Sequence, residues 1–314
     1  MTRFLTSGTL AACVLGLAGG QQQPTFRAGS DLVRVFVTVM DRDGRLVTTL
    51  ARDDFEVRDD GKPQPITQFD NTPQPVRLIV MLDVSGSMEG NLPLLRDAGA
   101  QLFARFRPDD VARVGAFGDD VSISPSFTHD PGELAAALPA SINPDAPTPL
   151  WRAIDQAIEA FGKEDDRRKV ILVLSDGKDT ASMSFGRKTA SQGGVIDRAR
   201  EEDVMIYAVG MRSRGRQRTP PAMGRAGLEE MLLADLPDPG LARVAEETGG
   251  GYIEIRAGQD LGAAFAGVAD ELHTQYLLGY APPKRDGKVH KTNVRVTQGG
   301  LKARARRSYV APRG

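Results

Sequence analysis

Hydrophobic and polar positions alternate along the first part of the chain, between residues 31 and 69. One face of the alternating runs carries the apolar side chains Val33, Val35, Val37, Val39, Phe55 and Val57. Turn-forming residues separate the runs at 41–44 and 59–61. Alternation with a period of two, interrupted by turns that contain Asp and Gly, is typical of antiparallel β-structure. Residues 21–75 are therefore predicted to form a β segment that ends in a Pro-containing linker at 71–75.

The pattern changes after residue 75 to nearly continuous apolar runs that alternate with stretches of helical periodicity. Strands are predicted at 76–82, 111–117, 121–127, 170–174, 204–209 and 252–255. Helices are predicted around 92–106, 150–161, 189–202, 241–248 and 261–272. Uniformly apolar strands are typical of a parallel sheet that is covered on both faces. The order of the elements predicts an α/β fold over residues 76–275, with a doubly wound, mostly parallel sheet flanked by helices.

The tail of the chain, residues 276–314, returns to β-type alternation around Tyr276–Tyr280 and Val294–Val296. Neither flanking segment is expected to form a stable sheet on its own, because small isolated β units are marginally stable. We therefore predict that residues 276–314 pair with residues 31–70 in a small β-sandwich-like domain. The α/β part is then inserted between the strands of this domain.

The first twenty residues have the features of a secretory signal peptide. Arg3 precedes a short apolar run, and small residues at 18–20 precede a polar segment. Residues 1–20 are therefore predicted to direct secretion, or export to the periplasm. An N-terminal membrane anchor is an alternative, although the run is shorter than the roughly 20 apolar residues of a membrane span. A second alternative is lipid anchoring through Cys13, because Leu10–Cys13 resembles a bacterial lipobox.

Composition and charge narrow the classes of function. Apolar residues make up 40% of the chain and charged residues 26%, which excludes a disordered chain and a multi-span membrane protein. Forty Lys and Arg balance forty-one Asp and Glu, so no nucleic-acid partner is expected. Cys13 is the only cysteine, which excludes a disulfide framework and a multi-cysteine metal site. After the first twenty residues, no apolar segment is long enough to span a bilayer.

Two stretches of the chain have an unusual charge or composition. Residues 284–313 contain ten Lys or Arg and one acidic residue, Asp286. We interpret this basic tail as the solvated face of an edge strand, where basic residues block unwanted pairing. Weak attraction to an anionic surface is the alternative. The Arg- and Pro-containing stretch at 211–240 is interpreted as an exposed insertion.

Oxygen-bearing side chains follow the first strand of the predicted parallel sheet. Asp83, Ser85 and Ser87 alternate along the chain where this strand ends. Thr148 precedes a predicted helix, and Asp176 follows the most apolar of the strands. The carboxyl ends of parallel strands meet at one edge of a sheet, so these side chains can converge. Carboxylates and hydroxyls suit a hard cation, Mg²⁺ or alternatively Mn²⁺ or Ca²⁺. The alternative is that these Asp and Ser side chains only cap the helices that follow the strands.

The same residues carry a family resemblance. The motifs that carry it are Asp83-x-Ser85-x-Ser87, Thr148–Leu150, Ser175–Gly177, Ile206–Gly210 and Thr248–Tyr252. Over residues 76–275, the chain resembles the von Willebrand factor A-type (VWFA) domain family, which implies a Rossmann-like fold. The flanks, with Asp54–Val57 and Gln275–Tyr280, resemble the secreted bacterial VWFA-related family of acidobacterial type.

The resemblance implies a metal-ion-dependent adhesion site. In that family two serines and a threonine contact the ion through their hydroxyls, and two aspartates act largely through bound water. The matching residues here are Ser85, Ser87, Thr148, Asp83 and Asp176. An acidic side chain of a protein ligand completes the coordination, so the resemblance implies a secreted, cation-dependent adhesion module and not an enzyme. Two departures concern the Thr148 loop, because Asp145–Pro147 replaces the usual glycines and Trp151–Arg152 stands where an acidic residue is often found.

Two other functions remain open. A metal-dependent hydrolase or phosphatase-like enzyme would use an Asp-initiated loop, but Ser85 stands where such phosphatases carry a second carboxylate. The G-x-S-x-G motif of serine hydrolases is absent, and none of His129, His273 and His290 ends a predicted strand of the parallel sheet. The remaining function is that of a structural domain with a vestigial metal site.

Overall fold

The computed structural model describes residues 32–162, 167–176, 179–180, 190–211, 237–256 and 259–314. The predicted signal peptide, with Cys13, and most of the predicted insertion at 211–240 lie outside the described residues. Within the described ranges, no helix combines the length and the apolar character needed to cross a membrane.

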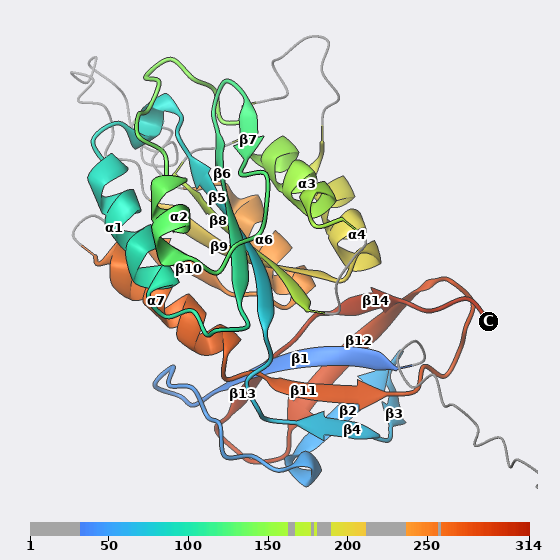
Figure 1. The fold of residues 1–314 in the computed structure, drawn as a ribbon. Helices are drawn as coiled ribbons and strands as arrows, with labels where there is room; N and C mark the ends of the chain where they lie inside the picture. The colour runs from blue at the N-terminus through green and yellow to red at the C-terminus, as the bar shows by residue number, and fades with distance from the viewer. Residues whose placement is uncertain (1–31, 163–166, 177–178, 181–189, 212–236, 257–258) are drawn as a thin grey trace, which may run out of the picture. The chain divides into compact units, whose positions relative to one another are not determined.

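A six-stranded, mostly parallel sheet lies at the centre of the α/β part of the fold (Figure 1). Its strands are β5 (Val76–Asp83), β6 (Val111–Phe117), β7 (Val121–Ile123), β8 (Arg168–Ser175), β9 (Val204–Met211) and β10 (Tyr252–Ile255). In space they follow the order β10-β9-β8-β5-β6-β7, and only the edge strand β7 runs antiparallel to its neighbour. Every residue of β5 and β9 is buried, as expected for strands covered on both faces. The predicted fold class is confirmed.

Helices cover both faces of this sheet (Figure 1). They are α1 (Leu92–Phe103), α2 (Pro131–Ala136), α3 (Leu150–Ala160), α4 (Gln192–Glu201), α6 (Pro239–Thr248) and α7 (Leu261–Leu272). Successive side chains of a strand point to opposite faces, so Leu78 and Val80 pack with α1, α2 and α7. Ile79 and Met81 pack with α3, α4 and α6 on the other face. The sheet therefore separates two hydrophobic cores.

Strands from the two ends of the described chain pair in two four-stranded sheets. The strands are β1 (Val33–Met40), β2 (Phe55–Asp59), β3 (Lys62–Gln64), β4 (Gln68–Asp70), β11 (Tyr276–Tyr280), β12 (Val289–Val296), β13 (Lys302–Arg304) and β14 (Ser308–Val310). The orders are β13-β1-β11-β4 and β14-β12-β2-β3. Val35 lies opposite Leu278 in the first sheet, and Val57 lies opposite Val294 in the second. Apolar side chains of both sheets share one core, which is the arrangement of a β-sandwich.

A buried polar junction joins the α/β part to the sandwich. Glu271 of α7 accepts hydrogen bonds from the Thr38 hydroxyl of β1, at 2.7 Å, and from the Tyr207 hydroxyl of β9. Arg168 of β8 donates to the carbonyl oxygen of Leu272 at 2.8 Å. Burial lowers the pKa of Arg168 to about 10, so its guanidinium stays charged at neutral pH.

Part of the basic tail belongs to the same junction. Three of its arginines make ion pairs with acidic residues of the α/β part: Arg304 with Glu271, Arg306 with Asp203 and Arg307 with Glu246. The interpretation of the tail as a solvated face is therefore wrong for Arg304 and Arg306, whose side chains are mostly covered, whereas Arg307 stays exposed. Their partners lie far away in the sequence, so a local pattern of charge does not indicate them.

Two local features differ from the sequence prediction. The predicted strand at 121–127 ends at Ile123. The short helix α2 was not predicted, although Asp130 accepts hydrogen bonds from the backbone N–H groups of Gly132 and Glu133, at 2.7 and 2.9 Å. An Asp N-cap followed by Pro at the first helical position is a recognised helix start, so the signal was present in the sequence.

Candidate metal centre

The candidate site lies where two adjacent parallel strands end. β5 ends at Asp83 and β8 ends at Ser175, and the two strands pair in parallel. From β5 the chain goes first to β6 on one side and later to β8 on the other side. A reversal of strand order of this kind opens a crevice at the carboxyl ends of the strands, where α/β proteins bind ligands.

The loop after β5 is shaped by its own side chains. The Asp83 carboxylate accepts a hydrogen bond from the Ser85 backbone N–H at 2.9 Å, and a 3₁₀ turn follows over Gly86–Met88. The buried side chain of Met88 anchors this turn in the core. A Cβ atom on Gly86 would lie 1.8 Å from the carbonyl oxygen of Pro144. Only glycine fits at residue 86, because the loop that carries Thr148 packs directly against it.

Four of the five predicted site residues are linked by hydrogen bonds. The Ser175 hydroxyl donates to Oδ2 of Asp83 at 2.5 Å. The hydroxyl oxygens of Ser85 and Ser87 lie 3.1 Å apart, and the Ser87 hydroxyl donates to Oδ1 of Asp176 at 2.6 Å. Asp83, Ser85 and Asp176 are buried. The ends of β5 and β8 therefore present their carboxylates and hydroxyls to one another.

Thr148 is held by hydrogen bonds of its own backbone. It is buried, and its N–H donates to the Thr180 hydroxyl at 2.8 Å, while the N–H of Thr180 donates back to the Thr148 carbonyl oxygen at 3.0 Å. On the other side, the Gly86 N–H donates to the carbonyl oxygen of Ala146 at 3.4 Å. The Thr148 loop is thus fastened to the loops that follow β5 and β8.

The departures from the family pattern have a structural counterpart. Asn143 stabilises the glycine-free loop, because its carbonyl oxygens accept the N–H groups of Asp145 and Ala146, both at 3.1 Å. Arg152 is directed to the β6–β7 turn, where it donates to the carbonyl oxygen of Asp119 at 3.5 Å. Trp151 packs against Gly240 at the start of α6. Neither side chain takes the place of the five oxygen-bearing residues.

The two carboxylates are buried together with few compensating groups. Burial raises the pKa of Asp83, although hydrogen bonds from Ser175 and Ser85 oppose the shift. Burial raises the pKa of Asp176 to about 6; the hydrogen bond from Ser87 opposes this shift, and the charge of Asp83 adds to it. Oδ2 of Asp176 is buried and has no hydrogen-bond partner within the described part of the chain. An unpaired buried carboxylate oxygen is costly, and a cation held by these oxygens would offset the cost.

The residues present therefore fit a hard divalent cation. Carboxylate and hydroxyl oxygens are the ligands that Mg²⁺ and Ca²⁺ prefer, and softer nitrogen or sulfur ligands are not among the five residues. All three histidines are described, and none is hydrogen-bonded to these five residues: His129 is exposed, His273 contacts Asp110 and His290 lies in the sandwich.

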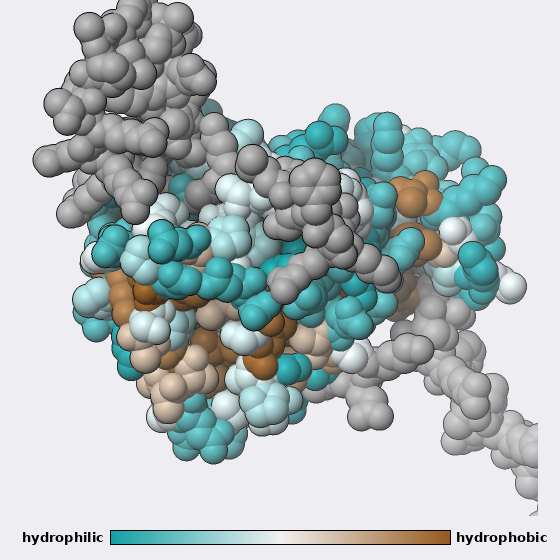
Figure 2. Space-filling model, turned by 90° about the horizontal axis from the view of Figure 1, so that it is seen from above, coloured by the Kyte–Doolittle hydropathy of each residue, from teal (hydrophilic) through white to brown (hydrophobic). Residues whose placement is uncertain are grey.

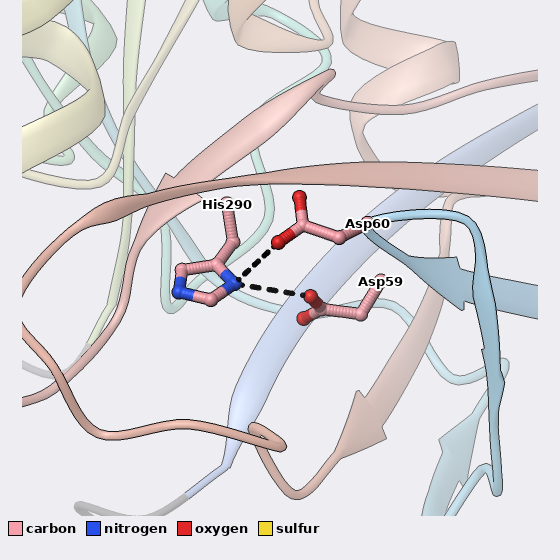
Figure 3. A group of neighbouring side chains, drawn as sticks. All are labelled: Asp59, Asp60 and His290. Atoms are coloured by element: carbon pink, nitrogen blue, oxygen red, sulfur yellow. Dashed lines mark hydrogen bonds and ion pairs between the residues drawn. The ribbon is translucent and has the colours of Figure 1, made fainter.

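The sequence prediction missed a second cluster of ligand-type side chains. Asp59 and Asp60 lie at the β2–β3 turn, and His290 faces them from β12 (Figure 3). The only local signal was an Asp-Asp-Gly turn, which predicts a hairpin. Its histidine lies 230 residues later in the sequence, so only the pairing of β2 with β12 brings the cluster together.

A parallel sheet covered by helices on both faces, with a cluster of oxygen-bearing side chains at its carboxyl edge, defines an α/β domain whose site residues fit a cation. Residues 78–178 match the family model of the von Willebrand factor type A domain. The chain therefore contains a von Willebrand factor type A domain, and all five predicted site residues lie within the matched range.

Several solved structures are similar to this chain. The protein BatB from Bacteroides thetaiotaomicron is 17% identical, with 63% of this chain and 97% of that chain covered and a TM-score of 0.43. A von Willebrand factor type A protein from Catenulispora acidiphila is 12% identical, with coverage of 91% and 76% and a TM-score of 0.47. The von Willebrand factor domain of a type V pili tip protein from Porphyromonas gingivalis is 12% identical, with coverage of 63% and 95% and a TM-score of 0.43. No curated protein matches the sequence.

Proposed function

We propose that this protein is a secreted, divalent-cation-dependent protein-binding module of the adhesion type. The cation, Mg²⁺ with Mn²⁺ or Ca²⁺ as alternatives, would be held by Asp83, Ser85, Ser87, Thr148 and Asp176. Von Willebrand factor type A domains are typically interaction modules without enzymatic activity, and the match over residues 78–178 supports this class of function. Secretion rests on the signal-peptide features of residues 1–20.

The observation that carries the proposal is the buried Oδ2 of Asp176, which has no hydrogen-bond partner among the described residues. It lies in a cluster with a second buried carboxylate, Asp83, and the hydrogen-bond donors to the two are serine hydroxyls and a backbone N–H group. Buried charges in folded proteins are paired or coordinate metals. A divalent cation is the partner that fits an all-oxygen cluster of this composition.

The five side chains would have two different roles, and this difference explains how a partner would bind. The hydroxyls of Ser85, Ser87 and Thr148 are neutral, so as direct ligands they would leave most of the positive charge of the cation unneutralised. Asp83 and Asp176 would hold bound water and supply the compensating charge at a greater distance. When bound, the cation offers an open coordination position to a carboxylate of the partner. Binding of this kind needs no turnover.

The character of the surface is consistent with polar recognition. Seen from above, the molecule presents mainly hydrophilic residues, with smaller hydrophobic patches between them (Figure 2). Among the described residues, the large hydrophobic side chains that are exposed are Leu94 and Val289. We therefore propose that an acidic side chain of the partner, and not an extensive apolar contact, provides most of the specificity.

Weak contact of the basic tail with an anionic surface is a separate part of the proposal. Three tail arginines are engaged in the junction, but the other basic side chains of the tail are exposed on the sandwich. Those within β12 and β13 are Lys291, Arg295 and Lys302. Exposed lysines attract anionic surfaces in a salt-dependent way.

The proposal is tested first by magnesium titration calorimetry. The wild type is expected to bind one Mg²⁺, and Asp83→Asn is expected to lose this binding while it keeps the circular dichroism spectrum of the wild type. Asp97→Asn, an exposed carboxylate on α1, serves as the matched control and should bind as the wild type does. Absence of Mg²⁺ binding in the wild type would favour a structural domain with a vestigial site.

The second step tests the partner. Immobilised wild-type protein is incubated with exported proteins in Mg²⁺ and then eluted with a chelator. We expect a protein that elutes with the chelator and is not retained by Asp83→Asn. Retention that is the same with Mg²⁺ and with chelator would contradict cation-dependent binding.

A further inference from the structure

A second cluster of ligand-type side chains lies in the β-sandwich (Figure 3). Nδ1 of His290 is 3.3 Å from Oδ1 of Asp59 and 3.0 Å from Oδ2 of Asp60. The three ligand atoms all lie within 4.8 Å of one another. His290 and Asp59 are buried, whereas the Asp60 side chain is 48% exposed. The cluster thus combines a buried base with an opening to solvent.

The hairpin between β2 and β3 holds the two carboxylates in place. Asp60 and Gly61 form its two-residue turn, with φ angles of 45° and 82°, which a tight hairpin turn requires at both central positions. Oδ1 of Asp60 accepts the Lys291 backbone N–H at 3.0 Å. This hydrogen bond fixes the carboxylate and leaves its Oδ2 facing His290.

Asp59 is oriented by tyrosine hydroxyls. Its Oδ2 accepts hydrogen bonds from Tyr280, at 3.0 Å, and from Tyr309, at 2.6 Å. Its Oδ1 is therefore the oxygen that remains for His290. Asp59 and Asp60 therefore each direct one carboxylate oxygen at the same ring nitrogen.

The other ring nitrogen of His290 is already engaged. Nε2 lies 3.1 Å from Oδ1 of Asp286, and the same oxygen accepts the Lys288 backbone N–H at 3.0 Å. Nε2 therefore carries a proton that it donates to Asp286. Nδ1 then holds either a second proton or a cation. With neither, its lone pair would point at two carboxylate oxygens and be repelled by them. A carboxylate on the far nitrogen is typical of a histidine that binds a metal through the near one.

The carboxylates around His290 favour a cation, and the distances permit one. Three carboxylates surround one imidazole, and the charges of Lys284 and Lys288 act on Asp60 and Asp286. Nδ1 nevertheless faces two carboxylate oxygens directly. A tetrahedral ion with metal–ligand bonds of about 2.0 Å separates its ligand atoms by about 3.3 Å, close to the 3.0 and 3.3 Å found here. His273 differs, because its partner Asp110 also accepts two backbone N–H groups and is fully used.

We propose that Asp59, Asp60 and His290 bind a divalent transition-metal ion, with Zn²⁺ as the best match to one imidazole and two carboxylates. The exposed side of Asp60 leaves a position for water. The ion would tie β12, from the tail of the chain, to the β2–β3 hairpin, from its beginning. This is a structural role, in a small sandwich that has no disulfide because Cys13 is the only cysteine.

Zinc titration of tag-free protein by calorimetry tests this site. We expect one Zn²⁺ per chain in the Asp83→Asn background, which removes the separate site at the end of β5, together with a higher melting temperature. Asp60→Asn should weaken the affinity at least tenfold, because it replaces a half-exposed ligand and keeps its shape. Asp43→Asn, an exposed carboxylate in another turn, is the matched control and should leave binding unchanged.

Nitrogen NMR of the His290 ring keeps the test decisive even if a variant folds poorly. The proposal expects the Nδ1 resonance to move on addition of Zn²⁺ while Nε2 stays protonated. Zn²⁺ binding that is equal in wild type and Asp60→Asn would overturn the proposal. So would a wild type that binds no Zn²⁺ and keeps a proton on both ring nitrogens.

Discussion

Strand β5 has a buried carboxylate cluster at each end, and the two clusters use their oxygens differently. At its start, Oδ1 of Asp110 accepts the Val76 N–H at 3.0 Å, and Oδ2 accepts the Arg107 N–H at 2.8 Å and His273 at 2.7 Å. At its end, Asp83 and Asp176 accept hydrogen bonds from serine hydroxyls and one backbone N–H group, and one oxygen of Asp176 has no partner in the described structure.

The pKa values of the two clusters move in opposite directions. Burial alone would raise the pKa of Asp110, but hydrogen bonds from His273 and two backbone N–H groups lower it overall. Burial raises the pKa of Asp176 to about 6, because the hydrogen bond from Ser87 does not compensate and the charge of Asp83 adds to the shift. The comparison teaches that a fully satisfied buried carboxylate stabilises the fold, whereas an incompletely satisfied one indicates a place for a ligand.

The largest expected effect concerns stability at the start of β5. Asp110→Ala removes the acceptor of two backbone N–H groups and of His273, so we expect a loss of about 3–5 kcal/mol in the free energy of unfolding. Urea denaturation measures it. Asp97→Ala, on the exposed face of α1, should change stability by no more than about 0.5 kcal/mol. A small loss in Asp110→Ala would contradict the structural role given to this cluster.

The pH dependence of stability should differ in sign between the two clusters. Asp176 has a folded pKa of about 6 against 3.8 for the model carboxyl, so the native state binds more protons in this range. Metal-free protein should therefore lose up to about 3 kcal/mol as the pH rises from 4 to 7. Asp110 has the opposite effect. Because its pKa is lowered in the folded state, it stabilises the protein at pH values above the pKa of the unfolded state, and this stabilisation is lost as the pH falls.

Urea denaturation with a chelator, between pH 4 and 7, separates these contributions. Asp176→Asn should abolish the decline with rising pH, and excess Mg²⁺ should reduce it in the wild type. If the decline persists unchanged in Asp176→Asn, the unsatisfied carboxylate is not its source.

A smaller effect is expected from the hydroxyls of the site. Ser87→Ala removes a proposed direct ligand and the hydrogen bond to Asp176, so the Mg²⁺ affinity should fall about tenfold, equivalent to about 1.4 kcal/mol. Calorimetry measures the affinity, and Ser126→Ala, in an exposed loop, is the control. Equal affinities in the two variants would remove Ser87 from the site.

The smallest effect is expected where the Thr148 loop is fastened. Thr180→Ala removes the hydroxyl that accepts the Thr148 N–H at 2.8 Å. We expect the Mg²⁺ affinity to fall about threefold, or about 0.7 kcal/mol, because the loop is loosened and no ligand is lost. Thr72→Ala, in an exposed loop, should have no effect. A tenfold loss would indicate that the loop contributes more than positioning.

The sequence contained most of the information on the α/β part. The nearly continuous apolar run at 76–82 and the helical periodicity that follows it predicted β5 and α1, because burial on both faces of a parallel strand leaves few polar positions. Asp83, Ser85 and Ser87, together with Thr148 and Asp176 at the ends of neighbouring elements, led to the prediction of a cation site, since the end of such a strand is where ligands bind.

The contacts between residues far apart in the chain could not be predicted from the sequence in the same way. The arginine pairs of the tail and the cluster around His290 depend on the register between strands far apart in the chain. A local pattern of charge predicts solvent exposure for such residues, and only the pairing of β1 with β13 and of β2 with β12 gives them partners. The unpartnered oxygen of Asp176 likewise follows from the packing of three loops.

An anomalous difference map from a crystal soaked in Mn²⁺ tests the central claim most directly. The account predicts a peak about 2.0–2.4 Å from the hydroxyl oxygens of Ser85, Ser87 and Thr148. Water, or a carboxylate from a neighbouring molecule, should occupy one coordination position of this ion. A map without a peak at the end of β5, or an ion whose coordination is completed by protein atoms alone, would contradict the account.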